Sequence, residues 1–296
     1  MRTYFLLGVK MATLAGFIAI FMWGMLAALS VFTNRIPPFQ LLFICFSIAA
    51  SLVYFKRLTY QEPLLKKPSL NKSQWIVGVL GLFGFHILYF LALRFAPPIQ
   101  ATLIIYLWPL MLGVMVASKG NKRFAILGGV IGFAGTIVMI AGGLETAQTN
   151  REQALVGYLC AAACALIWAN YSWFLSKSAS DVEDISWVAL VVAIISLACH
   201  LIFESGVWDL TTTELVMVIL IGIGPTGGAF YLWDIGMKKG NQSWIASFSF
   251  GTPVIASLAL FLFGFSDLTL SIVIAASLIV LGAVVSNSLS KNQELG

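Results

Sequence analysis

The stretch MATLAGFIAIFMWGMLAALSVF, residues 11–32, runs for 22 residues without a charged side chain. A helix that crosses the hydrocarbon core of a bilayer needs about 20 apolar residues at a rise of 1.5 Å each. Residues 11–32 therefore predict a membrane-spanning helix, and because no small-residue cleavage site follows, we expect it to be retained and not removed as a signal peptide. Nine further stretches have the same character, roughly 38–55, 73–95, 98–118, 122–141, 154–177, 184–203, 212–237, 242–264 and 269–290.

The composition also indicates a chain that lies mostly within the bilayer. Hydrophobic residues make up 60% of it, charged residues only 10%, and the mean hydropathy is +0.95. A soluble domain has about a quarter of its residues charged. Inside hydrocarbon every backbone N–H and C=O must find a partner, so the apolar stretches are expected to be helical throughout. The alternating strands of about ten residues that build a membrane β-barrel do not occur. We predict an all-α integral membrane protein without a water-soluble domain.

The ten predicted spans fall into two groups of five, residues 11–141 and 154–290. Because five is odd, a second group that repeats the first must enter the membrane from the opposite side. An inverted repeat of this kind forms two half-bundles around a central cavity, which is the architecture of many secondary transporters. A shift of about 144 residues supports the repeat, since it brings residues 19–23 close to register with 164–168 and places Pro109 over Pro253.

The net charge of +5 could suggest a nucleic-acid partner, but the positions of the basic residues exclude it. With the N-terminus in the cytoplasm, 14 of the 17 Lys and Arg residues fall in cytoplasmic segments. The three that fall on the other side are Arg35, Arg94 and Arg151. This bias follows the positive-inside rule, so we expect both termini in the cytoplasm and the lipid bilayer as the surrounding partner.

The four cysteines, Cys45, Cys160, Cys164 and Cys199, all lie within predicted spans. Cys160 and Cys164 are four residues apart on one helix face, a spacing that suits packing better than a disulfide. Histidine and carboxylate residues, which complete most metal sites, are not close to them in the sequence. We therefore expect no metal site and no cofactor.

Tryptophan and proline residues lie at the middle of several spans, at the depth where a transporter holds its substrate. Trp23, Trp108 and Trp168 fall at mid-depth. Because tryptophan prefers the membrane interface, we expect a polar cavity or a hydrogen-bond partner beside them. A mid-helix proline frees a carbonyl and kinks the helix. The prolines that we expect to act as kinks or hinges are Pro109, Pro225 and Pro253.

His86 is the only histidine near the predicted membrane centre, and Tyr89 lies about one turn further along the same face. An ionisable residue at this depth is a candidate functional residue. His86 could donate a hydrogen bond to a substrate carboxylate or accept a proton during transport. It could equally be a neutral imidazole bonded to a facing helix.

Further polar positions could contact a substrate. Asp234 is the only carboxylate embedded in a span, and Lys238 follows at the spacing of a helical ion pair. This pair could be structural, or Asp234 could bind a cation or an amino group. In the sixth span Trp168 and Tyr171 share one face, with Asn170 beside them, as in an aromatic ligand pocket. Because so few ionisable residues are buried, we expect facilitated diffusion and not strong ion coupling.

Several short motifs resemble those of a known family. Ile105-Tyr106-Leu107-Trp108-Pro109 is the most specific, and residues 232–236, 240–241 and 250–254 carry the others. Over about residues 11–290 the chain resembles the EamA-type exporters of the drug/metabolite transporter superfamily. The resemblance implies a basket-shaped fold of ten helices in the bacterial inner membrane that exports amino acids through a central cavity. It also implies that Trp108 and Trp168 line the substrate path, and we add Tyr106 and Trp23 to the candidate substrate-binding residues.

Other functions remain open on the sequence alone. A carrier of the same fold could move drugs or other metabolites. A nucleotide-sugar carrier would want basic groups in its cavity to meet phosphate, and no Lys or Arg lies at mid-depth. A lipid-modifying enzyme would need clustered catalytic side chains at an interface, and the sequence offers no such cluster. A passive pore is a further alternative. We expect a transporter and not an enzyme.

Overall fold

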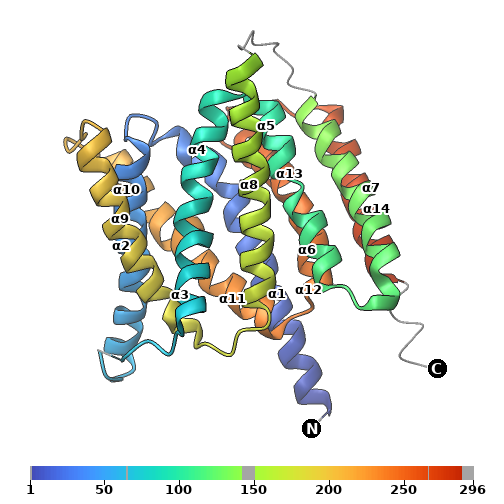
Figure 1. Cartoon of the computed structure of the whole chain (residues 1–296), viewed down its shortest axis with the longest axis horizontal. Helices are drawn as coiled ribbons and strands as arrows, with labels where there is room; N and C mark the ends of the chain where they lie inside the picture. The colour runs from blue at the N-terminus through green and yellow to red at the C-terminus, as the bar shows by residue number, and fades with distance from the viewer. Residues whose placement is uncertain (1, 65, 142–150, 266, 289–296) are drawn as a thin grey trace.

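The computed structural model describes residues 2–64, 66–141, 151–265 and 267–288 (Figure 1). Within these residues the chain forms helices and connecting segments, and no strand. The longer helices are α1 (Arg2–Val31), α2 (Pro38–Thr59), α3 (Lys72–Val79), α4 (Phe85–Phe95), α5 (Pro98–Ile105), α6 (Trp108–Val116), α7 (Lys122–Ala141), α8 (Arg151–Leu175), α9 (Ile185–Phe203), α10 (Thr212–Ile223), α11 (Ala229–Lys239), α12 (Gln242–Phe248), α13 (Thr252–Leu262) and α14 (Leu270–Ser288). Short turns of other helix types are η1 (Leu80–Gly84), η2 (Lys119–Asn121), η3 (Val182–Asp184), η4 (Gly224–Gly228) and η5 (Ser249–Gly251).

Eight helical stretches of the described chain are long and apolar enough to cross a bilayer, which confirms the prediction of an all-α membrane protein. They are Leu7–Val31, Pro38–Thr59, Lys72–Phe95, Ala154–Leu175, Val182–Phe203, Thr212–Lys239, Gln242–Leu262 and Leu270–Asn287. A shorter apolar stretch, Gln100–Val116, coincides with the predicted fourth span. The helix α7 coincides with the predicted fifth.

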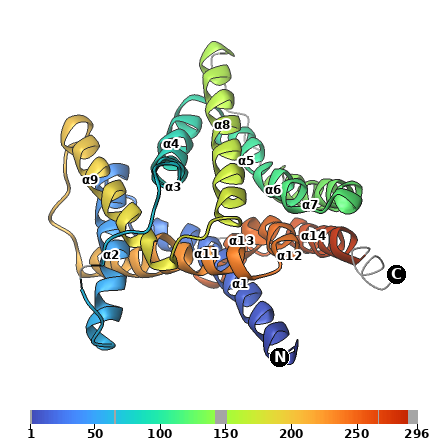
Figure 2. The same cartoon turned by 60° about the horizontal axis from the view of Figure 1, so that its bottom comes forward.

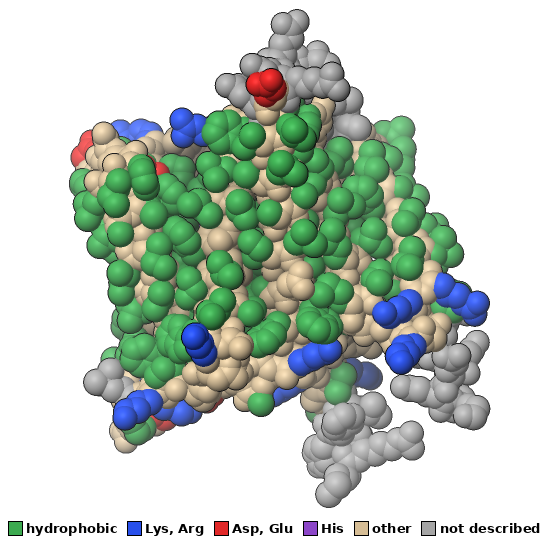
Figure 3. All heavy atoms as spheres, in the orientation of Figure 1, with side chains coloured by type: hydrophobic (Ala, Val, Ile, Leu, Met, Phe, Trp, Pro, Cys, Tyr) green, Lys and Arg blue, Asp and Glu red, His purple; other side chains and the backbone are tan. Residues whose placement is uncertain are grey.

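The outer surface is apolar, as contact with lipid requires. Figure 3 shows hydrophobic side chains over most of the height of the helices, with Lys and Arg side chains gathered mainly at the lower edge in this view. Leu201 and Leu262 are 72% and 78% exposed. A soluble protein rarely exposes so large an apolar surface, whereas hydrocarbon tails accept it. The surface therefore fits a protein that is embedded in a bilayer.

Four of the described helical stretches are interrupted near their middle, and glycine or proline lies at each interruption. The π-helical turns η1 and η4 join α3 to α4 and α10 to α11, and Pro225 lies in η4. The helices α6 and α13 each begin with a proline in their first turn, Pro109 and Pro253. Proline lacks an N–H donor and its ring clashes with the carbonyl one turn earlier. A new helical segment therefore starts at each of these two prolines.

Helices that are far apart in the sequence pack side by side. Figures 1 and 2 show α7 along α14 at one edge of the molecule and α2 beside α9 at the other. Between these edges α4 packs against α8. In every one of these pairs one helix precedes residue 142 and the other follows residue 150, so the two parts of the chain interlock.

The α7–α14 contact depends on glycines that let the two backbones approach closely. A Cβ atom added to Gly128 would lie 2.4 Å from the carbonyl oxygen of Gly282. A Cβ atom added to Gly282 would likewise lie 2.5 Å from the carbonyl oxygen of Gly128. Small residues are the usual means of close helix packing in membranes, where no hydrophobic force draws helices together.

Candidate functional site: an aromatic cavity between the helices

A cavity of about 740 Å³ lies in the middle of the molecule. Small-molecule sites typically occupy about 300–1,000 Å³, so this space can hold an amino acid with water around it. Among the described residues its lining contains no Lys, Arg, Asp or Glu. The lining residues are Trp23, Leu26, Ala27, Ser30, Leu41, Leu42, Cys45, Phe85, His86, Tyr89, Phe90, Thr102, Ile105, Tyr106, Trp108, Trp168, Ile221, Pro225, Thr226, Phe230, Thr252, Pro253, Ala256 and Ser257.

The cavity extends towards one face of the membrane. It follows α1 from Trp23 to Ser30, towards the C-terminal end of that helix. Leu41, in the first turn of α2, and Ser257, at the middle of α13, also line it. The cavity therefore lies towards the C-terminal end of α1, away from the N-terminus that Figure 1 shows at the bottom.

Four tryptophans form a layer beneath the cavity. The ring centroids of Trp23 and Trp168 are 5.4 Å apart and those of Trp23 and Trp233 are 5.0 Å apart. Trp108 meets Trp168 at 6.2 Å and Trp233 at 5.9 Å, both edge to face. Aromatic pairs favour this geometry and gain about 0.5–1.5 kcal/mol beyond the burial of their surface. The layer, which we call the tryptophan layer, is therefore mutually supported and closes the lower side of the cavity.

The indole N–H groups of this layer differ in their partners. The Trp23 N–H donates to the carbonyl oxygen of Pro225 at 3.0 Å, and the Trp233 N–H donates to the Ser172 hydroxyl at 3.1 Å. Neither Trp108 nor Trp168 donates a hydrogen bond to any described residue, and neither indole nitrogen is among the fully buried atoms that lack a partner. Because both residues line the cavity, their indole N–H groups are the candidate donors to a ligand there.

His86 is oriented by its own helical segment. Its Nδ1 lies 2.6 Å from the carbonyl oxygen of Leu82, which can only accept, so Nδ1 carries a proton, and in the neutral ring Nε2 is the acceptor. The ring meets Phe46 edge to face at 5.6 Å. The bond to Leu82 runs along the same segment and not to a facing helix. Tyr89 and Tyr106 lie in the same lining, and neither hydroxyl bonds to a described residue.

Some predicted site residues lie outside this cavity. Tyr171 packs against Trp168 at 5.2 Å between ring centroids but lines a separate small pocket, together with Asp234. Asn170 is exposed and donates to the carbonyl oxygen of Leu166 on its own helix. Pro109 is buried within α6 and does not reach the lining, whereas Pro225 and Pro253 do. The cavity thus brings together eight candidates, Trp23, His86, Tyr89, Tyr106, Trp108, Trp168, Pro225 and Pro253.

Comparison with known proteins identifies the family of this chain. The EamA-like transporter family matches residues 10–141 and 155–288. The chain belongs to the EamA-like transporter family. The resemblance to EamA-type exporters inferred from the short motifs is therefore confirmed.

Relatives within this family align with this chain over most of its length. The aromatic amino acid exporter YddG of Ancylobacter novellus is 38% identical over 289 residues, which are 95% of this chain and 98% of that protein. YddG of Escherichia coli is 23% identical over 258 residues, 83% of this chain and 86% of that protein. A solved crystal structure superposes with a TM-score of 0.86 at 36% identity, covering 96% of this chain and 99% of that one.

Some lining and layer residues of this EamA-family chain were not predicted from the sequence. Trp233 is fully buried in the tryptophan layer, and Phe230, one turn earlier on α11, lines the cavity. A signal for Trp233 was present, because the shift of about 144 residues placed it over Tyr89. Phe85 packs on Trp168 at 5.2 Å between centroids, and no pattern in the sequence distinguished it from the other phenylalanines.

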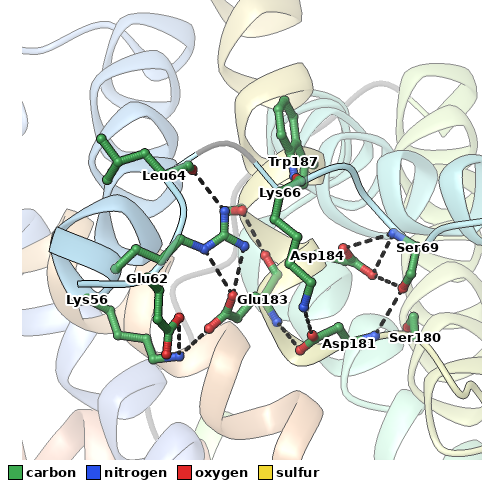
Figure 4. Close-up of polar contacts among 12 residues, drawn as sticks. Lys56, Glu62, Leu64, Lys66, Ser69, Ser180, Asp181, Glu183, Asp184 and Trp187 are labelled. Carbon is green, nitrogen blue, oxygen red and sulfur yellow. Dashed lines mark hydrogen bonds and ion pairs between the residues drawn. The ribbon is translucent and has the colours of Figure 1, made fainter. Parts of the chain in front are cut away.

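A polar network covers the lower face of the EamA-family fold (Figure 4). Lys56 and the buried Arg57, both on α2, pair with Glu183. Lys66 pairs with Asp181 at 2.7 Å, and this hydrogen bond lowers the pKa of Asp181 and raises that of Lys66. Further along, Asp184 accepts hydrogen bonds from the backbone N–H and hydroxyl of Ser69. The network joins residues 56–69 to residues 181–184, so it ties the first part of the chain to the second.

A second polar network ties the same two parts of the chain at the upper face. Arg35 and Glu214 form an ion pair at 2.8 Å, and the hydrogen bond that Arg35 donates to Glu214 raises the pKa of Arg35. The side-chain amide of Gln40 bonds to the backbone of Val207 in both directions, at 2.7 and 2.9 Å. The lower network joins α2 to η3, directly before α9, and the upper network joins α2 to the segment after α9, so α2 is tied to the chain on either side of α9.

Proposed function

We propose that this protein is a carrier that exports amino acids, aromatic and other neutral ones, across the bacterial inner membrane by facilitated diffusion. The observation that carries the proposal is the uncharged aromatic cavity of about 740 Å³ with the open indole N–H groups of Trp108 and Trp168. Its membership of a transporter family and its likeness to aromatic amino acid exporters support the same conclusion.

The cavity offers each part of an amino acid a partner. An aromatic side chain can stack on Trp108 or Trp168, which is worth about 0.5–1.5 kcal/mol beyond burial. The substrate ammonium can lie over an indole face for about 0.5–2 kcal/mol. Its carboxylate can accept the two open indole N–H groups, and Nε2 of His86 can accept from the ammonium. Each contribution is modest, which suits a carrier that must release what it binds.

We further propose that the chain crosses the membrane ten times as two inverted halves, residues 11–141 and 154–290, with both termini in the cytoplasm. Support comes from α5–α6 and α7, which add two crossings to the eight long stretches. The basic side chains along the lower edge in Figure 3 support placing that edge in the cytoplasm. On this orientation the cavity extends towards the periplasm, and the prolines at the helix interruptions are the hinges of alternating access.

The test is saturable uptake of labelled phenylalanine by the purified protein in liposomes. Trp108→Ala and Trp168→Ala should each weaken the apparent affinity by at least about tenfold, because each removes an aromatic wall of the cavity. Trp208→Ala is the matched control, since Trp208 is exposed in the segment between α9 and α10, outside the cavity lining. Unchanged uptake in both cavity variants would overturn the proposed path.

A carrier for drugs or other metabolites is the second candidate, and the apolar lining is the observation that favours it. Phosphorylated substrates fit this lining poorly, because it offers no Lys or Arg among the described residues. Competition by apolar cations, with no competition by any amino acid, would favour this second candidate over the first.

A further inference from the structure

A second, much smaller pocket lies on the other side of the tryptophan layer from the cavity. It has a volume of about 30 Å³, enough for one or two water molecules. Two helices connect the two spaces. On α11, Phe230 lines the cavity, Trp233 belongs to the layer, and Asp234 lines the pocket. On α8, Trp168 lines the cavity and Tyr171 lines the pocket.

The pocket contains a buried carboxylate oxygen without a partner. Asp234 is fully buried, and its Oδ2 accepts a hydrogen bond from the ammonium of Lys238 at 2.9 Å. Its Oδ1 accepts none from the described residues. Asp181 and Asp184 also line the pocket, but their carboxylates bond to Lys66 and Ser69. A buried acceptor without a partner is costly, and such groups often mark the place of a ligand.

Lys238 already shows how an ammonium is held at this place. Its Nζ donates to Asp234, to the carbonyl oxygen of Ser180 at 2.7 Å and to the Ser180 hydroxyl at 3.0 Å. One carboxylate and two neutral oxygens thus surround the lysine ammonium. A free amino acid carries the same ammonium group, which can form the same three bonds.

We propose that this pocket is the closed cytoplasmic entrance of the transport path and that Asp234 binds the ammonium of an entering amino acid when Lys238 moves away. This inference rests on the proposed function and on the proposed orientation. In the present conformation the entrance is shut, because the Trp233–Ser172 and Lys238–Ser180 hydrogen bonds both tie α11 to α8 and the segment after it. Opening requires α8 and α11 to separate below the tryptophan layer.

Two substitutions with opposite expected effects test the proposal. Labelled phenylalanine is offered to inverted membrane vesicles, whose cytoplasmic face points outwards, and the half-saturating concentration is measured. Asp234→Asn should raise it about tenfold, because the charged acceptor of the ammonium is lost. Lys238→Met should lower it, because the competing ammonium is removed and the carboxylate is left free. The half-saturating concentration of the double variant should stay above that of the original protein, since the double variant still lacks the carboxylate.

A purely structural ion pair would behave differently. Both single variants would then change uptake in the same direction, and the double variant would return towards the original protein; either result overturns the proposal. If Lys238→Met does not reach the membrane, Ser180→Ala replaces it, because it weakens the hold on Lys238 and should also lower the half-saturating concentration. Absence of saturable phenylalanine uptake in the unsubstituted protein would instead overturn the proposed function itself.

Discussion

At the scale of single residues, the open N–H groups of Trp108 and Trp168 distinguish the cavity wall from ordinary aromatic packing. Trp23 and Trp233 have partners inside the protein, so their N–H groups serve the structure. The other two N–H groups have no partner among the described residues. A site that is only apolar would not discriminate between an amino acid and a hydrocarbon of the same shape. Donors without a partner favour a ligand that carries an acceptor, because a hydrocarbon would leave them unpaired.

Trp168→Phe isolates the contribution of one such donor, because it keeps a ring and removes the N–H. The apparent affinity for phenylalanine should fall about two- to tenfold, the usual range for one hydrogen bond. Inhibition by phenethylamine, which lacks the carboxylate, should be unchanged. The measurement is competition against labelled phenylalanine in liposomes. An equal loss for both compounds would mean that the ring, and not the N–H, is what matters.

Helical spacing explains which residues of the sixth span could be predicted and which could not. Trp168 and Tyr171 are three residues apart and share a face, but the cavity ends at Trp168, so Tyr171 lies in the pocket below. Asn170 is two residues from Trp168, and residues two apart do not share a helix face. Its side chain is accordingly exposed. The helix face on which a side chain lies can be predicted from the sequence. The depth at which a cavity ends cannot, because it depends on the packing of other helices.

At the scale of helices, the eight apolar stretches long enough to cross a bilayer were predictable because hydrocarbon demands continuous helical hydrogen bonding. The prolines indicated where three stretches are interrupted, and Pro109, Pro225 and Pro253 each lie at or beside an interruption. The π-helical turn at residues 80–84 was not predicted, because it contains no proline. Gly81 within this turn lies close to α8, because a Cβ added to it would lie 2.4 Å from the ring of Tyr171.

The α7–α14 contact should be the most sensitive helix pair to an added methyl group. Gly128→Ala places a Cβ against the backbone of α14, which cannot move as a flexible side chain can, so we expect destabilisation of about 1–3 kcal/mol. Gly113→Ala on α6 is the control, because its Cβ would meet only the Cβ of Ala246 at 4.0 Å. Thermal unfolding in detergent measures both. Equal midpoints for the two variants would contradict this account of the contact.

Two ion pairs of the lower network, Arg57–Glu183 and Lys66–Asp181, should differ in their contribution to stability. Arg57 is 3% exposed and donates to Glu183 and to the carbonyl oxygen of Leu64, so Arg57→Ala should cost about 1–3 kcal/mol. Lys66 and Asp181 are exposed, and salt and water screen their pair, so Lys66→Ala should leave the unfolding midpoint almost unchanged.

The pH dependence of the exposed pair follows from its pKa shifts. The pKa of Asp181 is lowered from 3.8, so its contribution is present above that value and is lost as the pH falls through the lowered pKa. The pKa of Lys66 is raised from 10.5, so its contribution is present below that value and is lost as the pH rises through the raised pKa. The small difference between Lys66→Ala and the original protein should therefore stay constant between about pH 5 and 9. A difference that varies within that window would contradict the assignment.

At the scale of the whole molecule, the two polar networks and the cavity describe a protein that is closed at one face. Helices α2 and α9 pack side by side, and hydrogen bonds tie α2 to Glu183 before α9 and to Val207 after it, so we expect the two helices to move as one unit. The Trp233–Ser172 hydrogen bond joins α11 to α8 at the tryptophan layer, the Lys238–Ser180 hydrogen bond joins α11 to the segment after α8 below it, and the cavity lies between Trp168 and Phe230 above it. On the proposed function, we expect the change of access to take place between α8 and α11.

The most direct test of the central claim is counterflow. Liposomes that contain the purified protein are loaded with unlabelled phenylalanine and diluted into a trace of labelled phenylalanine. A carrier whose cavity opens to one side at a time should show a transient accumulation of label above the outside concentration, with an initial rate that saturates. Label that only equilibrates, at a rate that rises linearly with concentration, would identify a pore and contradict alternating access.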